Sequence, residues 1–141
     1  MLIYPSDDGN AAFVRLDRGT DMLEGLNEAA QKLEIEAGTV QAIGAVSELV
    51  VGYFDQERKE YRTNSFPSAF EIGSGVGNVS RKDGKPFVHL HVVATGPDGA
   101  SVGGHLMPGT TVYLIEAYVR RLGGTAPVRE QDDELGLAVW H

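Results

Sequence analysis

Residues 87–106, with the sequence FVHLHVVATGPDGASVGGHL, predict two β-strands joined by a tight turn. Phe87 to Thr95 is an apolar, β-branched run, and Ala100 to Leu106 returns after the turn signal Pro97-Asp98-Gly99. This signal favours a turn because proline fixes its own φ and glycine accepts a positive φ. We therefore expect a β-hairpin here, and the sequence on either side continues the same pattern.

Three of the four histidines of the chain lie in this hairpin. His89 and His91 are two residues apart on a strand, which places both side chains on one face with Cα atoms roughly 6.5 Å apart. Antiparallel pairing about the turn at residues 96–99 sets His105 roughly opposite position 90, with a possible slip of one or two residues. Three imidazoles that converge in this way are the ligand set of an open zinc site, whose fourth position holds water.

The three histidines also have a second interpretation, as hydrogen-bonded polar residues at the edge of a core or at a subunit contact. The chain has no cysteine, so any bound metal must use histidine, aspartate or glutamate. Neutral imidazole suits zinc. We expect a divalent ion, with zinc as the first choice, bound by His89, His91 and His105.

One helix and a series of hairpins are predicted in the rest of the chain. Thr20 is the expected N-cap, directly after the turn Asp17-Arg18-Gly19. The apolar positions that follow have helical spacing up to an end near Gly38: Met22, Leu26, Ala29, Ala30 and Leu33. From Thr39 onward the pattern becomes strand-like. One long helix followed by successive hairpins predicts an α+β fold with a mainly antiparallel sheet, in a single domain spanning residues 1–141.

Glycines and charges add detail to this outline. Gly44, inside an apolar strand, predicts a bulge or a close approach of two backbones. Residues 73–78, GSGVGN, superficially resemble a nucleotide-binding loop, but no helix follows to hold phosphate, so a glycine-lined strand is favoured. Residues 82–85, KDGK, predict a hairpin turn. Residues 129–134 predict a charged loop before the apolar segment 135–140.

Composition narrows the classes of partner. The chain has 141 residues and a formal net charge of −8, and an acidic surface repels phosphate backbones, which disfavours direct nucleic-acid binding. The absence of cysteine fits a cytoplasmic protein. The first residues, MLIYPSDD, show no signal-peptide pattern, and no apolar run approaches the ~20 residues that span a membrane. We therefore expect no membrane partner.

Two glutamates are weaker candidates for a catalytic role. Glu71 and Glu116 each lie between apolar residues of predicted strands. Such a carboxylate could orient a metal-bound histidine or act as general base beside a metal-bound water. Alternatively, each occupies an outward strand face or pairs with an arginine such as Arg15. No nucleophile-elbow pattern of the Gly-x-Ser-x-Gly type is present, so nothing supports covalent catalysis.

The order of short motifs resembles the PPC (plant and prokaryote conserved) domain over about residues 10–140. The pair His-Leu-His and Gly-Gly-His-Leu, at 89–91 and 103–106, is the specific part of this likeness. The other pieces follow in the same order: Arg15–Gly19, the helix, Ala42–Ala45, Gly52–Asp55, Tyr61, Glu71, Gly77-Asn78, Asp83–Pro86 and Glu116.

The resemblance implies an α+β domain that assembles as a homotrimer and uses the three histidines as metal ligands. In plants the domain follows AT-hooks in nuclear DNA-binding regulators, where it mediates self-association. This chain has no Arg-Gly-Arg-Pro hook. The stand-alone prokaryotic members, often labelled DNA-binding by that kinship, have no settled activity to carry over.

Three functions are compatible with the sequence. The first is an oligomeric metal-binding domain with a structural or interaction role. The second is a metal-dependent hydrolase, since an open three-histidine site lowers the pKa of bound water to about 7. The third is a DNA-associated regulator. Whether the chain is an enzyme stays open at this point, because no substrate-specificity pocket can be read from the residues.

Overall fold

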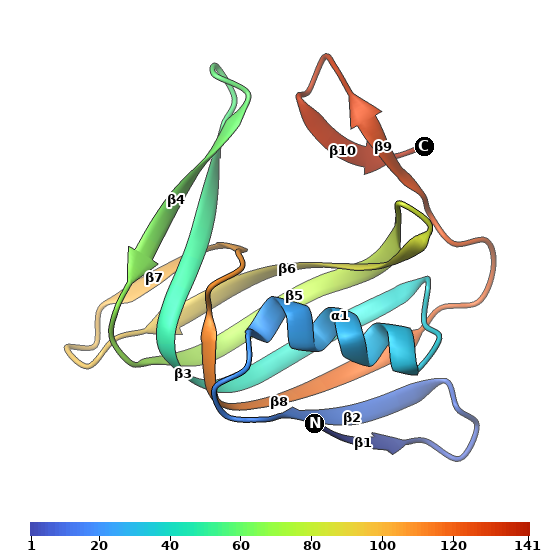
Figure 1. Ribbon diagram of the computed structural model, residues 1–141, viewed down its shortest axis with the longest axis horizontal. Helices are drawn as coiled ribbons and strands as arrows, with labels where there is room; N and C mark the ends of the chain where they lie inside the picture. The colour runs from blue at the N-terminus through green and yellow to red at the C-terminus, as the bar shows by residue number, and fades with distance from the viewer.

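A computed structural model describes all residues, 1–141, as a strongly bent antiparallel sheet with one helix on a face and a separate small hairpin (Figure 1). The elements in chain order are β1 (Leu2–Pro5), β2 (Ala11–Leu16), α1 (Met22–Lys32), β3 (Gly38–Asp55), β4 (Glu60–Phe66), β5 (Phe70–Lys82), β6 (Lys85–Thr95), β7 (Ser101–Leu106), β8 (Thr111–Arg121), β9 (Arg129–Asp132) and β10 (Leu137–Trp140). The α+β class and the antiparallel sheet are confirmed.

Strand β3 organises the sheet because it is long enough to pair with different partners along its length. The strand order is β1-β2-β8-β3-β5-β6-β7, and β4 pairs with the second half of β3. Near Gly44 the register of β3 shifts against both β5 and β8. Gly44 has φ of 135°, and a Cβ there would lie 2.1 Å from the carbonyl oxygen of Leu114. The expected irregularity at this glycine is therefore present.

Helix α1 begins one residue later and ends earlier than the sequence suggests. Asp21, not Thr20, is the N-cap, and its Oδ1 accepts from the backbone N–H of Glu24 at 2.9 Å. Both residue types are good caps, but the second carboxylate oxygen of Asp21 also accepts from the N–H of Gly109, which fixes the choice. The helix ends at Lys32 because Glu34, with φ of 53°, turns the chain away; eleven residues make a short helix, not a long one.

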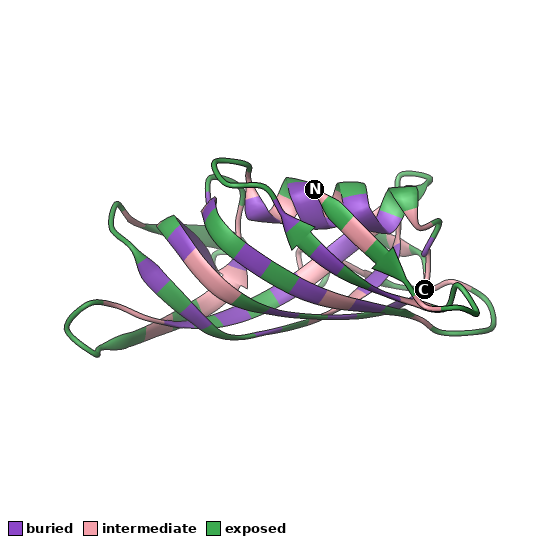
Figure 2. Cartoon of the chain, turned by 90° about the horizontal axis from the view of Figure 1, so that it is seen from below, coloured by how far each residue is buried: buried purple, intermediate pink, exposed green.

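The hydrophobic core lies between the helix and one face of the sheet. Met22, Leu26 and Ala29 of α1 are fully buried, as are Leu90 of β6 and Ile115 of β8. Buried and exposed residues alternate along the strands, as the bands of Figure 2 show, because successive side chains of a strand point to opposite faces. The sheet face turned away from the helix is consequently open in the single chain.

The charged tail differs from the expected loop. Arg129–Asp132 and Leu137–Trp140 pair as the β9–β10 hairpin, and the segment before it is tied to β5 by the N–H of Arg81, which donates to the carbonyl of Pro127 at 2.9 Å. At its turn, the carbonyl of Asp133 accepts from Lys59 Nζ at 3.0 Å. Lys59 lies in the turn between β3 and β4, so the two hairpins that rise from the sheet in Figure 1 touch each other.

The helix has neither the length nor the apolar character that a membrane crossing requires.

Candidate metal centre

The three histidines come together on the hairpin that the sequence predicts. On β6, His89 and His91 alternate with the fully buried Val88 and Leu90, so both imidazoles lie on the face turned away from the core. On β7, His105 pairs directly with His91. The two neighbouring strands thus present three ring systems on one face.

The observed register differs by one residue from the expected one. Pairing about residues 96–99 predicts that His105 faces position 90, whereas its partner is His91. The connecting loop is one residue longer than a four-residue turn: the N–H of Gly96 donates to the carbonyl of Ala100 at 2.9 Å, and Gly99 takes φ of 80°. Because an extra residue moves every later position by one, His105 directly faces an imidazole rather than the leucine between the two.

The distances within the triad suit one small ion. One potential ligand atom from each of His89, His91 and His105 lies within 4.8 Å of the others, and the ring centroids are 4.8–5.4 Å apart. On a tetrahedral zinc ion with bonds of about 2.0–2.1 Å, ligand nitrogens lie about 3.4 Å apart. The ligand nitrogens therefore need to approach one another by up to about 1.4 Å, which side-chain rotations supply.

The surroundings keep two of the rings in the form that binds metal. Burial is the main cause that lowers the pKa of His89 to about 4, and positive charge on His105, Arg129 and His91 adds to it. Burial likewise lowers the pKa of His105 to about 4, with His91 and Arg129 contributing. At neutral pH both imidazoles are neutral, and a neutral imidazole carries the lone pair that a metal requires.

One nitrogen of the triad has no partner in the chain. Nδ1 of His105 is buried and makes no hydrogen bond. Leaving such a buried polar atom unsatisfied costs about 1–3 kcal/mol, so isolated cases in a well-packed region call for an explanation. Three imidazoles, one of them with a buried unpartnered nitrogen, form a donor set that fits a divalent transition metal such as zinc.

Arg129 also belongs to this site, although no motif in the sequence predicts it. It lies at the start of β9, and its Nη2 is 3.1 Å from Nδ1 of His89. The same guanidinium donates to Ser80 Oγ at 2.9 Å, to Asn78 Oδ1 at 3.2 Å and to the carbonyl of Ala138 at 3.0 Å. Burial lowers the pKa of Arg129 below its ordinary value, but guanidinium keeps its proton at any working pH. The segment that the sequence predicts as a charged loop thus places the guanidinium of Arg129 beside the triad.

A groove of about 390 Å³ opens beside the imidazoles and the guanidinium. His89, His105 and Arg129 form its polar part. Tyr61 on β4 contributes an aromatic wall, with its ring centroid 5.0 Å from that of His105. The remaining lining is largely apolar and comes from five parts of the chain: Leu23, Phe87, Leu106, Met107, Pro108, Leu137, Ala138 and Val139, together with Lys82, whose Nζ lies 5.3 Å from the centroid of the Phe87 ring. No pattern in the sequence predicts this groove.

The structure does not bring the two candidate glutamates to the triad. Glu71 is exposed on β5 and pairs with Thr95, four residues along β6 from His91, a distance of about 13 Å for an extended strand. Glu116 is exposed on β8, which β3 and β5 separate from β6. Its position directly across from Arg15 agrees with the alternative that pairs it with that arginine.

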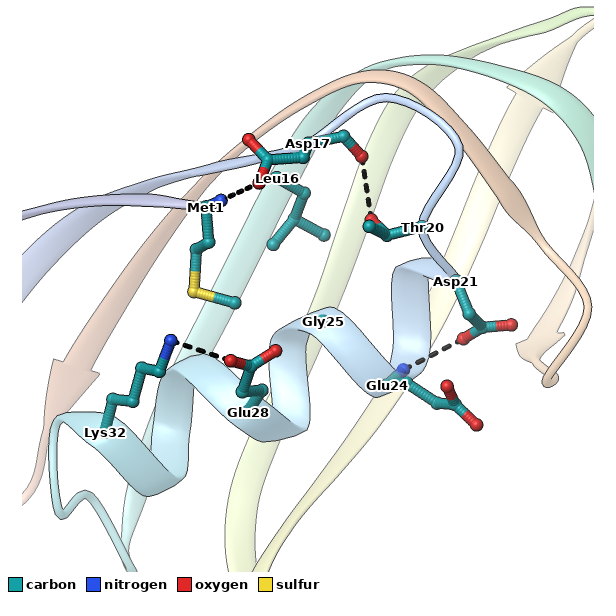
Figure 3. A pocket seen from close by; sticks show the side chains of 9 residues that line it. All are labelled: Met1, Leu16, Asp17, Thr20, Asp21, Glu24, Gly25, Glu28 and Lys32. Atoms are coloured by element: carbon teal, nitrogen blue, oxygen red, sulfur yellow. Dashed lines mark hydrogen bonds and ion pairs between the residues drawn. The ribbon is translucent and has the colours of Figure 1, made fainter.

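A second hollow, of about 530 Å³, lies between α1 and the first residues of the chain (Figure 3). Three of its four acidic side chains already have partners. Asp17 is paired with the amino group of Met1, Glu28 with Lys32 at 2.7 Å, and Asp21 caps the helix. These acidic groups are used within the chain, so the histidine triad is the better candidate for a metal centre.

Comparisons with known proteins agree on one family. The family model of the Plants and Prokaryotes Conserved (PCC) domain matches residues 5–123. A metal-containing protein from Archaeoglobus fulgidus is 41% identical, with a TM-score of 0.89, and the match covers 100% of this chain and 99% of that one. A plant- and prokaryote-conserved (PPC) protein from Pyrococcus horikoshii is 31% identical, with a TM-score of 0.88 and coverage of 99% and 94%.

A candidate DNA-binding protein from Bacteroides thetaiotaomicron shares the fold at 25% identity, with a TM-score of 0.89 and coverage of 100% and 98%. No curated protein matches the chain. The family match covers most of the chain and includes β6 and β7, which carry the three histidines. This chain is therefore a member of the Plants and Prokaryotes Conserved domain family, the PPC domain.

Proposed function

We propose that this PPC domain binds one divalent metal ion, with zinc as the first choice, through His89, His91 and His105. The observation that carries the proposal is the convergence of three imidazoles within 4.8 Å, two of them with a lowered pKa. A relative that is 41% identical is described as metal-containing, which supports it further. Three protein ligands leave one position on a tetrahedral ion for water or for a ligand.

Elemental analysis of protein purified without chelator tests this proposal. The expected content is about one metal ion per chain, lost in His105→Ala because two imidazoles hold zinc far more weakly than three. His141→Ala is the matched control, since His141 is the fourth histidine and lies outside the triad. Metal-free protein that is also indifferent to added zinc would overturn the proposal.

We further propose that the chain assembles as a homotrimer, as the family resemblance implies. The open face of the sheet supports self-association, because Phe13, Ile43, Val76 and Val93 are all more than half exposed there. Val76 lies directly across from His91, so an interface on this face would border the triad. Sedimentation equilibrium should give three times the 15.1 kDa chain mass and a smaller species for Ile43→Glu. A wild-type monomer at micromolar concentration contradicts the proposal.

A metal-dependent hydrolase is a second candidate function, and the groove beside the triad is the observation that favours it. Zinc-loaded protein should then cleave a small activated ester faster than the metal-free protein does. Because Glu71 and Glu116 lie away from the triad within one chain, Glu71→Gln and Glu116→Gln should leave this zinc-dependent rate unchanged. Equal rates with and without zinc would remove this candidate.

A role at DNA comes from the family kinship and from the description of the Bacteroides relative. The formal net charge of −8 opposes direct contact with phosphates. Retention of duplex DNA that weakens steeply with added salt would show such contact, whereas no retention at low salt would exclude it for this chain alone.

A further inference from the structure

Arg129 holds a positive charge in the site without a carboxylate to balance it. The four hydrogen bonds of its guanidinium go to neutral groups, on Ser80, Asn78, His89 and Ala138. None of the ion pairs in the chain includes Arg129. The rings of Phe87 and Trp140, each with its centroid 5.5 Å from the guanidinium carbon, cover part of the cation. A shielded, unpaired arginine is a ready receptor for an anion.

The hydrogen bond between Arg129 and His89 is incompatible with His89 as a neutral metal ligand. A guanidinium only donates, so Nδ1 of His89 must accept through its lone pair. The neutral ring has only one bare nitrogen, and Nε2 then carries the proton. If the metal binds Nδ1, the lone pair is taken; if it binds Nε2, the proton moves to Nδ1, which can no longer accept. In either case metal binding frees one N–H of Arg129.

The freed donor lies next to a divalent cation in a region without a nearby acid. Neither Glu71 nor Glu116 reaches this region, and the lining of the groove contains no aspartate or glutamate. The charge of the metal and that of Arg129 together call for an anionic oxygen that both can share. The adjoining walls are mainly apolar, so the rest of such a ligand is apolar as well.

We propose that the metal-loaded triad and Arg129 together bind a small organic carboxylate, whose apolar part lies in the groove between Tyr61, Phe87 and Leu137. This inference rests on the metal site proposed above. The carboxylate binds beside the triad and accepts from the Arg129 guanidinium. The groove volume of about 390 Å³ suits a ligand of the size of an arylalkanoic acid.

Calorimetry and cobalt spectroscopy test the proposal with phenylacetate as the probe. Protein loaded with Co²⁺, its metal content measured first, should bind phenylacetate saturably and change its visible absorption bands. The neutral isostere phenylacetamide should bind at least about tenfold more weakly, because it lacks the charge that Arg129 recognises. By linkage, phenylacetate should also raise the affinity of the protein for Co²⁺, measured at equilibrium in competition with a chelator.

Arg129→Gln is the informative variant, and Arg120→Gln, which removes an exposed arginine on β8, is the matched control. Arg129→Gln should weaken phenylacetate about tenfold or more while it keeps cobalt and leaves phenylacetamide unchanged. Arg129→Lys should lie between, because lysine keeps the charge but not the planar donor pair. Arg120→Gln should match the wild type.

Each outcome decides one of the two proposals. If no cobalt binds, the metal site fails. If cobalt binds and phenylacetate does not, or if phenylacetamide binds equally well, the carboxylate proposal is overturned. The same holds if folded Arg129→Gln binds phenylacetate as the wild type does. If Arg129→Gln does not fold, the comparison of phenylacetate with phenylacetamide on the wild-type protein still tests the carboxylate proposal.

Discussion

Replacing Gly77 with alanine should damage both the fold and the triad. Gly77 lies on β5 directly opposite Leu90 of β6, and a Cβ built there would lie 1.9 Å from the carbonyl oxygen of His89. Ordinary van der Waals contact begins at 3.4 Å, so the two strands would have to separate locally by about 1.5 Å. The atom that must move belongs to the backbone of a histidine ligand.

The magnitude follows from that displacement. Overpacking a tight contact typically costs about 1–3 kcal/mol, and a backbone clash of this depth belongs at or above the upper end. We therefore expect Gly77→Ala to lower the free energy of unfolding by about 3 kcal/mol. Because the shift of the His89 backbone moves its ring by a comparable amount, zinc affinity should fall at least about tenfold.

Urea unfolding of the metal-free protein and zinc titration in competition with a chelator measure the two effects. Gly73→Ala is the control on the same strand, since a Cβ there has its nearest neighbour at 3.9 Å. That variant should be neutral, or more stable by up to about 1 kcal/mol because alanine restricts the unfolded chain. A free energy of unfolding for Gly77→Ala within about 0.5 kcal/mol of the wild-type value, the range of a neutral surface substitution, would contradict the expected clash with the His89 carbonyl.

Three further outcomes are expected. Asp21→Ala should destabilise the protein by about 1–2 kcal/mol in urea, because it removes the helix cap. Asp21→Asn should recover only part of that loss, because its single amide oxygen can cap the helix while its NH2 group cannot accept from the N–H of Gly109. Thr110→Val should destabilise by about 1–3 kcal/mol, because the buried hydroxyl accepts from the N–H of Val50 at 3.0 Å and that donor would lose its partner; an unchanged urea midpoint would contradict this. The pKa of His89 and of His105 is about 4 in the folded chain, against an ordinary 6.5, so between these values the unfolded chain binds more protons. Metal-free protein should therefore lose stability as pH falls from about 6.5 toward 4, and urea midpoints measured at several pH values detect this loss. The double variant His89→Gln/His105→Gln should lose less stability over the same pH range.

Local signals in the sequence were sufficient to predict the β6–β7 hairpin and the grouping of three histidines on one of its faces. The alternation of His89 and His91 with valine and leucine predicts their shared face, since a strand repeats every two residues. The turn signal at Pro97-Asp98-Gly99 brings His105 back beside them. Gly44 marked a backbone irregularity, and residues 73–78 proved to be a strand with glycine where β6 approaches closely.

Other features were settled by contacts between distant parts of the chain. Thr20 and Asp21 are both good cap residues, and the backbone of Gly109, 88 residues away in sequence, selects Asp21. The register of His105 depends on whether the loop between β6 and β7 has four or five residues. The turn-forming residues of the loop do not reveal that length. Glu71 and Glu116 lie between apolar strand residues, as the histidines do, and this similarity made them candidates. The order of the strands in the sheet keeps both glutamates apart from the triad.

The α+β class, the antiparallel hairpin and the grouping of the three imidazoles follow from the amino-acid order, because alternation along a strand and reversal at a turn are properties of neighbouring residues. The surroundings of the triad depend instead on how distant parts of the chain pack together. Arg129 reaches His89 across 40 residues because the β9–β10 hairpin folds back beside β5, and the groove forms where that hairpin, β4 and β6 meet. Contacts of that range depend on the packing of whole elements, which no local pattern encodes.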